Sequence, residues 1–207
     1  MELHIRLRQI IAFVASFVAI WALCAPTQAD LLYSADHSEC TAKIASWYAK
    51  HVPVVYQADK PLLINEYNDR QMNAYLVSGS PNDTAYKSSE NGQDDLSDVD
   101  GVYENSPARI TVRVPRDRAI DLFTFAHEYG HYVWFNIFSG HDRSSYEAIY
   151  NRQKENHRLV TRYAFTNVEE GFAEAFSFYT NQPAMLKYRD PESYAFLDQY
   201  RNGNSSE

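Results

Sequence analysis

Two histidines and a glutamate lie close together in the segment His127-Glu128-Tyr129-Gly130-His131. In a helix, histidines four residues apart lie on one side, so both imidazoles can reach the same metal ion. Glu128 follows His127 directly, and a carboxylate there can take a proton from a metal-activated water and pass it to a leaving amine. The flanking residues are mostly apolar, which favours a buried helix over a solvated one that exposes two histidines. The motif predicts a zinc site that activates water.

A catalytic zinc needs a third protein ligand and an open fourth position for water or substrate. A histidine in the extended HExxHxxGxxH pattern would fall at Ile137, so that pattern fails, and His141 lies in a polar stretch. Glu170 and Glu174 are better candidates, because they lie four residues apart in an apolar segment with helical periodicity. One of these carboxylates can bind the ion while the other accepts a ring N–H from a ligand histidine. Burying carboxylates here without a cation would be costly, which also favours a metal site.

The pattern of apolar residues predicts a single α+β domain: a small mixed sheet, followed by a helical C-terminal half. Residues 78–101 are rich in Ser, Asn and Asp and predict a solvated loop, in which Asp98-Val99-Asp100-Gly101 lacks the later ligands of a calcium loop. We expect helices at 38–52, 119–138, 144–157 and 167–180, and strands at 54–56, 61–67, 72–77, 102–104 and 108–114.

The first 29 residues have the features of a secretory signal peptide. Basic residues precede an apolar run from Ile10 to Cys24, and Ala29 ends a small-residue cleavage site. The run is about fifteen residues long, shorter than the roughly twenty that span a bilayer, which favours a cleaved signal over a retained anchor. Residues 1–29 are therefore predicted to be removed, leaving residues 30–207 as the mature domain. We expect it to be secreted, or periplasmic if the host has an outer membrane, with no stable membrane association. Its single cysteine, Cys40, allows no internal disulfide.

Composition narrows the choice of partners. The chain has 207 residues, with 19 Lys and Arg against 27 Asp and Glu and a formal net charge of −8. An acidic chain of this kind lacks the basic footprint of a nucleic-acid partner. Tyrosine is abundant, with 16 Tyr beside 11 Phe. These rings can build a core and also line a groove.

Three segments together resemble the catalytic domain of the anthrax lethal factor-like metallopeptidases, which include the small secreted Pro-Pro endopeptidases of bacteria. They are His127–His131, Tyr163–Asn167 and Glu170–Phe176, and the resemblance covers roughly residues 110 to 180. It implies a zincin-like fold with one catalytic Zn²⁺ ion, with Glu170 as the third zinc ligand. It also implies that Glu174 bonds to a ligand histidine and that Tyr163 stabilises the oxyanion. The residues from Met72 to Gly101 do not follow the family, so the resemblance implies no substrate preference.

The expected function is therefore a secreted zinc-dependent metalloendopeptidase in which Glu128 is the general base. In zincin folds a protein or peptide substrate commonly lies extended and antiparallel to an edge strand above the HExxH helix, and Ala108–Val114 is the expected strand. Arg113 and Tyr103 are candidates for tuning selectivity. The alternative is a secreted zinc-containing binding or adhesion protein that has a protease-like fold and no turnover. The presence of Glu128 argues against it, because a purely structural zinc needs no general base.

Overall fold

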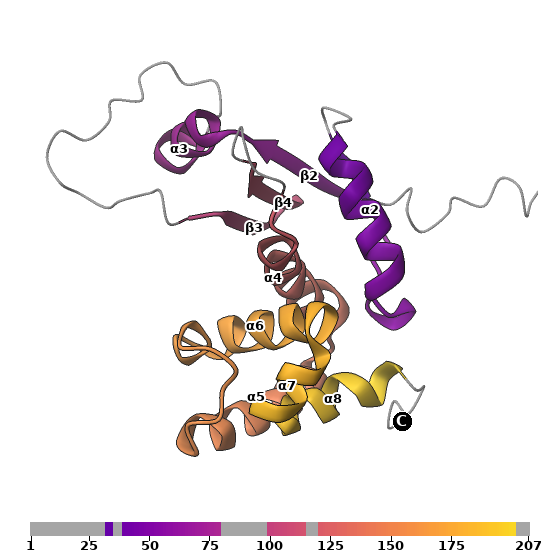
Figure 1. Ribbon diagram of the computed structural model, residues 1–207, viewed down its shortest axis with the longest axis vertical. Coiled ribbons are helices and arrows are strands. Elements are labelled where there is room, and N and C mark those ends of the chain that lie inside the picture. Colours follow the sequence, from indigo (N-terminus) through magenta and orange to yellow (C-terminus); the bar gives the residue numbers. More distant parts are fainter. Residues whose placement is uncertain (1–31, 35–38, 80–98, 115–119, 202–207) are drawn as a thin grey trace, which may run out of the picture.

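The computed structural model describes residues 32–34, 39–79, 99–114 and 120–201 (Figure 1). The predicted signal peptide, most of the predicted 78–101 loop and the side chain of Cys40 lie outside the described residues. Within the described ranges, no helix has the length and the apolar character needed to cross a bilayer.

The described strands form one mixed sheet of four strands in the order β1-β2-β4-β3. The strands are β1 (Leu32–Ser34), β2 (Leu62–Tyr67), β3 (Gly101–Asn105) and β4 (Ala108–Arg113). The first two strands and β4 are parallel, whereas β3 pairs antiparallel with β4 and aligns Tyr103 with Ile110. Strands β1 and β3 are therefore the two edges of the described sheet.

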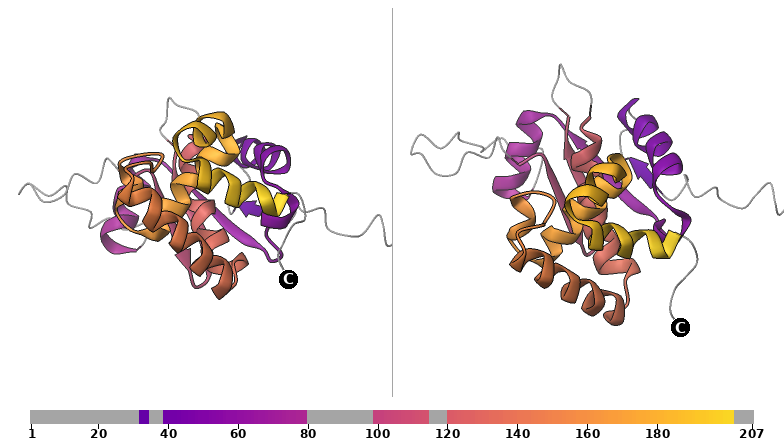
Figure 2. Two further views of the ribbon diagram at one scale, coloured as in Figure 1. Left: turned by 90° about the horizontal axis from the view of Figure 1, so that it is seen from below. Right: turned by 60° about the horizontal axis from the view of Figure 1, so that its bottom comes forward.

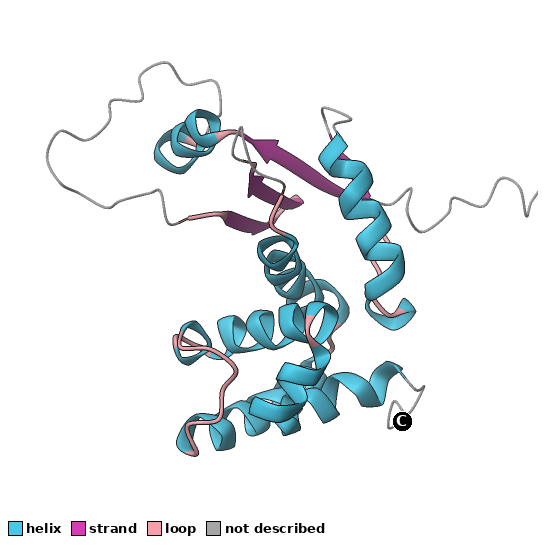
Figure 3. Cartoon of the chain, in the orientation of Figure 1, coloured by secondary structure: helices cyan, strands magenta, loops and turns pink. Residues whose placement is uncertain are grey.

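Helices flank the sheet and build the C-terminal half, as Figure 3 shows by secondary structure. They are α2 (Glu39–His51), α3 (Asp69–Ser78), α4 (Leu122–Tyr132), α5 (Gly140–Glu155), α6 (Val168–Asn181), α7 (Pro183–Arg189) and α8 (Pro191–Arg201). Helix α4 lies between the sheet and α6, and α5, α7 and α8 lie beyond α6 (Figures 1 and 2). The α+β fold expected from the sequence is confirmed.

Tyrosines form much of the core between α2, α4 and α6. The hydroxyls of Tyr48 and Tyr129 lie 3.1 Å apart, and Tyr129 donates to the carbonyl of Tyr56 at 2.8 Å. Tyr56 and Tyr129 also pack against Phe176 of α6. Because each of these three hydroxyls has a hydrogen-bond partner, the rings are buried without leaving an unsatisfied polar group.

Several predicted elements match the structure closely. The predicted strand 61–67 is β2, the predicted hairpin is β3 and β4, and the helix at 38–52 is α2. The helix predicted at 119–138 comprises α4 and the π-helical turn η4 (Val133–Ile137). The helix predicted at 144–157 begins earlier, at Gly140, because the Ser139 side chain caps it by accepting from the backbone N–H of Asp142. The last predicted helix, 167–180, is α6.

Two predicted strands were wrong. Residues Val54–Tyr56 form a short 3₁₀ helix, and residues 72–77 belong to helix α3. The N-terminus of α3 carries a capping box between Asn68 and Gln71, and its C-terminus ends at Gly79 in the left-handed conformation, with φ 75°. These end signals outweigh the strand propensity of the residues between them. The sequence analysis also missed α7 and α8, although each begins with a proline.

The predicted position of the edge strand was also wrong. Ala108–Val114 was expected at the edge, but β4 (Ala108–Arg113) pairs with β2 on one side and with β3 on the other. The hairpin folds β3 back along the outer side of β4, so β3 lies at the edge next to α4. An extended peptide that adds to this edge would pair with β3.

Candidate metal centre

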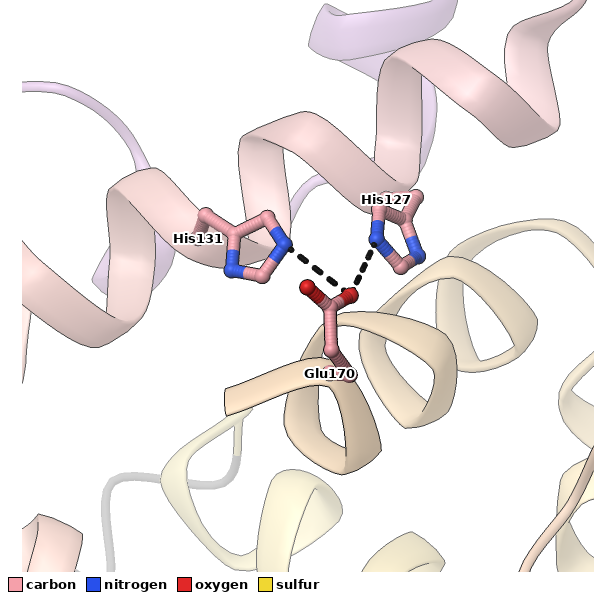
Figure 4. A group of neighbouring side chains, drawn as sticks. All are labelled: His127, His131 and Glu170. Atoms are coloured by element: carbon pink, nitrogen blue, oxygen red, sulfur yellow. Dashed lines mark hydrogen bonds and ion pairs between the residues drawn. The ribbon is translucent and has the colours of Figure 1, made fainter. Parts of the chain in front are cut away.

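The structure brings together the two histidines of α4 and one glutamate of α6. One ligand atom each from His127, His131 and Glu170 lie within 4.8 Å of one another. The Nε2 atoms of His127 and His131 lie 3.0 and 3.4 Å from the same carboxylate oxygen, Glu170 Oε2 (Figure 4). Two imidazole nitrogens and one carboxylate oxygen are a donor set that suits a catalytic zinc with an open fourth position. This group can therefore hold a metal ion.

The close approach of α4 and α6 lets a short carboxylate side chain reach both imidazoles. A Cβ atom added to Gly130 would lie 2.8 Å from the Cα of Ala173, so the two backbones almost touch at this point. Glu170 lies one turn before Ala173, in the first turn of α6, where Asn167 caps the helix by accepting from the Glu170 backbone N–H at 2.8 Å. Gly130, inside the histidine motif, is thus required by packing, because a larger side chain would not fit against Ala173.

Glu174 orients one of the histidines. Its Oε1 atom lies 2.8 Å from Nδ1 of His127, while Nε2 of the same ring faces Glu170. A carboxylate bonded to one ring nitrogen fixes which nitrogen can bind a metal and how the ring is turned. Glu174 is therefore placed where it can fix the ring of His127.

The histidines and carboxylates of this group shift one another's pKa values strongly. Burial lowers the pKa of His127, but its hydrogen bonds to Glu170 and Glu174 outweigh burial and raise this pKa to about 9. Burial raises the pKa of Glu170, but the hydrogen bonds from His127 and His131 outweigh it and lower this pKa to about 2. A positive charge is therefore favoured between the carboxylates, and either a proton or a bound cation can provide it.

Glu128 lies between α4 and the edge strand and is 7% exposed. The Tyr103 backbone interacts with its carboxylate and lowers its pKa, and a Cβ atom added to Gly101 would lie 2.6 Å from Glu128 Oε1. Burial raises the pKa of Glu128, and the nearby His127 and His131 offset part of that rise. The carboxylate is thus held on two sides and lies beside the candidate metal ligands. The sequence analysis missed Gly101, although glycine in a strand often marks such a close approach.

Tyr163 lies on the other side of the group, in the 3₁₀ helix η5 (Tyr163–Phe165) that precedes α6. Its side chain is 55% exposed and its ring centroid lies 5.8 Å from that of His127. Burial, together with the negative charges of Glu170 and Glu128, raises the pKa of its hydroxyl. The hydroxyl therefore stays protonated at neutral pH and can donate a hydrogen bond.

Two cavities flank the candidate metal ligands, with volumes of about 540 and 430 Å³. Both are lined by Gly101, His127, Glu128 and Tyr163, so each reaches the same centre. The larger cavity also contacts an edge-to-face pair of rings, Phe123 and Phe178, and the smaller one a stacked pair, Tyr103 and Phe135. The candidate ligand group is therefore open to a cavity on either side.

His141 and Glu169 lie near the candidate ligands in sequence but do not belong to the ligand group. His141 is exposed near the start of α5. Glu169 is half-buried and lines the smaller cavity without joining the three ligand atoms.

Comparisons with known proteins support the family resemblance. The family model described as "Anthrax toxin lethal factor, N- and C-terminal domain" matches residues 63–200. Among solved structures, the fold is similar to that of the Pro-Pro endopeptidase PPEP-2 from Paenibacillus alvei, with a TM-score of 0.52 and 19% identity. That match covers 84% of this chain and 100% of the other. No curated protein sequence matches the chain. The chain therefore belongs to the anthrax toxin lethal factor family, which confirms the predicted resemblance and the metallopeptidase class that it implies.

Proposed function

We propose that this chain is a secreted, zinc-dependent metalloendopeptidase in which Glu128 is the general base. The observation that carries the proposal is the position of the Glu128 carboxylate, buried between the edge strand and the two histidines of α4. A purely structural zinc site needs no general base, and Glu128 lies beside the candidate ligands without being one of them. His127, His131 and Glu170 are the proposed zinc ligands, and Glu174 fixes the ring of His127.

A zinc ion held by these residues would polarise the scissile carbonyl and lower the pKa of a water molecule towards about 7. Glu128 then accepts a proton from the attacking water and delivers it to the leaving amine nitrogen. The hydroxyl of Tyr163 donates a hydrogen bond to the carbonyl oxygen as negative charge develops there. The reaction requires no covalent intermediate with the protein.

The open edge of β3 is the proposed binding surface for an extended peptide. The Arg113 N–H donates to the Asp100 carbonyl at 2.7 Å, so the alternation of an antiparallel pair turns the backbone groups of Gly101 and Tyr103 away from β4. A peptide chain lying antiparallel to β3 would pair with the backbone groups of Gly101 and with the Tyr103 carbonyl, and its scissile bond would lie beside Glu128. The endopeptidase activity in the name of PPEP-2 supports a peptide substrate here.

Secretion rests on the signal-peptide pattern of residues 1–29. N-terminal sequencing of protein recovered from the culture medium tests it. We expect the mature chain to begin at Asp30, whereas a chain retained in the membrane with an intact N-terminus would contradict the proposal.

Peptide cleavage tests the chemistry. The zinc-loaded protein and its Glu128→Gln variant are incubated with a diverse peptide pool, and every new terminus is identified by mass spectrometry. We expect the substitution to lower turnover by about 10²–10⁴-fold, the usual contribution of a general base, with zinc content unchanged. Glu147→Gln, which changes an exposed glutamate of α5, is the matched control and should cleave like the wild type. A folded, zinc-loaded wild type that cleaves nothing would instead favour the binding or adhesion protein.

A further inference from the structure

Arg113 is a buried arginine at the end of β4. Its side chain is 5% exposed. Residues Thr111 and Arg113 alternate along β4 with Ile110 and Val112, which lie in the hydrophobic core. The Arg113 guanidinium faces α3, where it donates to Asn73 Oδ1 at 3.0 Å. Arg113, a candidate for tuning selectivity, is therefore too buried to contact a substrate directly.

The guanidinium binds the chain segment that leads into the edge strand. Both Nε and Nη2 donate to the Val99 carbonyl, at 3.1 and 3.0 Å, and Nε lies 3.5 Å from Asp100 Oδ1. Nη1 donates to Asp69 Oδ1 of α3 at 3.3 Å, and the Arg113 backbone N–H donates to the Asp100 carbonyl. One side chain thus joins α3, β4 and the entry to β3. A lysine cannot reproduce this planar fork of donors.

The entry to β3 lies directly against the proposed general base. Gly101 follows Asp100, and a Cβ atom at Gly101 would lie 2.6 Å from Glu128 Oε1 and 2.7 Å from Glu128 Cγ. Two residues later, the Tyr103 backbone also interacts with this carboxylate. There is less than a methyl group of free space between Gly101 and Glu128, so a shift of the strand must also move the carboxylate.

Strand β3 needs such an anchor, because it is a five-residue edge strand that pairs, among the described residues, with β4 alone. Its far end has different anchors. Asn136 donates to Asn105 Oδ1 at 3.2 Å, and Arg109 forms a two-bond ion pair with Glu104. At its near end, the Arg113 guanidinium is the charged side chain that holds Val99 and Asp100.

We propose that Arg113 is a positioning residue for Glu128: it fixes the entry of β3 and, through Gly101 and the Tyr103 backbone, the orientation of the carboxylate. The proposal rests on the proposed function, because it assigns Arg113 a part in the proton transfer that Glu128 performs. It places a determinant of turnover on the opposite face of the sheet from the metal ligands.

Kinetics of Arg113→Met and Arg113→Lys test the proposal, with Arg109→Met as the matched control. Arg109 lies in the same strand on the same face, and its loss removes an ion pair at the far end of β3. Misplacing a reacting group by about 1 Å can cost 10²-fold in rate. We expect Arg113→Met to lower kcat by about 10- to 100-fold with KM and zinc content nearly unchanged. Arg113→Lys should lose less, and Arg109→Met should stay within about twofold of the wild type.

A double-mutant cycle separates positioning from a general loss of structure. If Arg113 acts through Glu128, Arg113→Met should cause little further loss of the residual turnover in a Glu128→Gln background. Equal losses in both backgrounds would overturn the proposal, as would an effect confined to KM or an equal loss in Arg109→Met. Thermal melts identify a folding defect, and if Arg113→Met fails to fold, Arg113→Lys carries the same cycle.

Hydrogen exchange at the Tyr103 amide provides a readout that needs no activity. Because the alternation of the antiparallel pair turns this N–H away from β4 and Tyr103 interacts with Glu128 instead, its exchange reports that contact. We expect faster exchange at Tyr103 in Arg113→Met and unchanged exchange in Arg109→Met. Unchanged exchange in both variants would overturn the positioning role even if the protein is a peptidase. A wild type that cleaves no peptide but shows the faster exchange in Arg113→Met would refute the proposed function and leave the positioning contact standing.

Discussion

The α4–α6 helix pair and the β3–β4 hairpin contribute to one cleft in different ways. The helix pair is joined by a direct approach of backbones at Gly130 and Ala173, and its carboxylates reach the histidines across that contact. The hairpin supports Glu128 through the Tyr103 backbone and Gly101. Metal binding is therefore assigned to a rigid pair of helices, whereas proton transfer also depends on an edge strand.

This difference implies that metal affinity and turnover can be changed separately. Substitutions between α4 and α6 should affect the ion first and turnover as a consequence. Substitutions along β3 should affect turnover while the ion stays bound. Such a separation is expected when a reacting group and the ligands beside it are held by different elements.

The largest expected effect lies within the helix pair, at Glu170. Glu170→Gln replaces one of three charged or imidazole donors by a neutral amide, so zinc should no longer be retained. In the wild type, free zinc at 100 times its Kd should stabilise the fold by about 2.7 kcal/mol, and this stabilisation should disappear in the variant. Thermal melts with and without added zinc measure it.

Substitutions of two nearby glutamates serve as comparisons for Glu170→Gln. Glu169→Gln changes the adjacent, half-buried residue that lies outside the ligand group, and it should keep the full response to zinc. Glu174→Gln should weaken zinc binding by about 10–100-fold, the usual effect of removing the partner of a ligand histidine. If Glu170→Gln bound zinc as tightly as Glu169→Gln, the assignment of Glu170 as a ligand would be wrong.

The next effect concerns Tyr163, which belongs to neither the helix pair nor the hairpin. Tyr163→Phe removes only the hydroxyl, and loss of one oxyanion donor lowers kcat by about 10²–10³-fold in comparable sites. Zinc content and KM should change little, because the hydroxyl contributes mainly in the transition state. Tyr188→Phe, at a side chain that is 80% exposed and lines neither flanking cavity, is the control. Steady-state kinetics on a cleaved peptide measure both; a kcat for Tyr163→Phe equal to that of the control would remove Tyr163 from the mechanism.

The same two regions differ in how well the sequence predicts them. The candidate ligands could be predicted because His127 and His131, or Glu170 and Glu174, are each separated by one helical turn, which is a local property. That both pairs converge on one point depends on the contact between Gly130 and Ala173. The helical spacing of the glutamates favoured this convergence, and the family resemblance assigned Glu170 as the ligand and Glu174 as the partner of a histidine. Local spacing in two segments is thus enough to predict the candidate zinc ligands.

The hairpin was predicted less well, because its environment is set by pairing between segments that are distant in sequence. The alternation of residue types along 108–114 matches the two faces of β4, with Ile110 and Val112 in the core and Thr111 and Arg113 on the other face. It did not indicate that β2 would take the inner side of β4 and leave β3 at the edge. A strand's own pattern gives its faces but not its neighbours. For the same reason, Gly101 and the partners of Arg113 became visible only in the structure.

A pair of glycine substitutions tests the separation with the same added methyl group. Gly130→Ala places a Cβ atom 2.8 Å from the Ala173 Cα, a backbone atom that cannot turn away, so we expect a loss of about 1–3 kcal/mol in unfolding free energy and weaker zinc binding. Gly101→Ala places a Cβ atom 2.6 Å from Glu128 Oε1, a side-chain atom that can move. It should lower kcat while the fold and zinc content stay close to the wild type.

Denaturant unfolding, zinc titration and kcat are measured on both glycine variants. Gly140→Ala is the control, because a Cβ atom there meets nothing within 4 Å. Loss of zinc in Gly101→Ala, or loss of turnover alone in Gly130→Ala, would contradict the separate roles of the hairpin and the helix pair.

The smallest expected effect is a proton released when zinc binds to the helix pair. In the metal-free protein the pKa of His127 is raised from 6.5 to about 9, so this ring carries a proton at pH 7 that zinc must displace. Calorimetric titration of zinc in buffers with different ionisation enthalpies should show about one proton released at pH 7, and fewer as the pH approaches 9.

The raised pKa of His127 also determines how the stability of the metal-free protein changes with pH. A raised pKa stabilises the folded, metal-free protein fully below pH 6.5, and this contribution is lost as the pH rises through about 9. The Tm of the metal-free protein should therefore fall across that window, while the zinc-loaded protein, in which zinc replaces this proton, should not show the fall. In Glu174→Gln the fall should shrink, because the pKa of His127 loses one of the two hydrogen bonds that raise it. The β3–β4 hairpin contributes no hydrogen bond to His127, so Arg109→Met should leave the pH range of the Tm fall unchanged. A shift of that range in Arg109→Met would show that the two regions are coupled through more than Glu128.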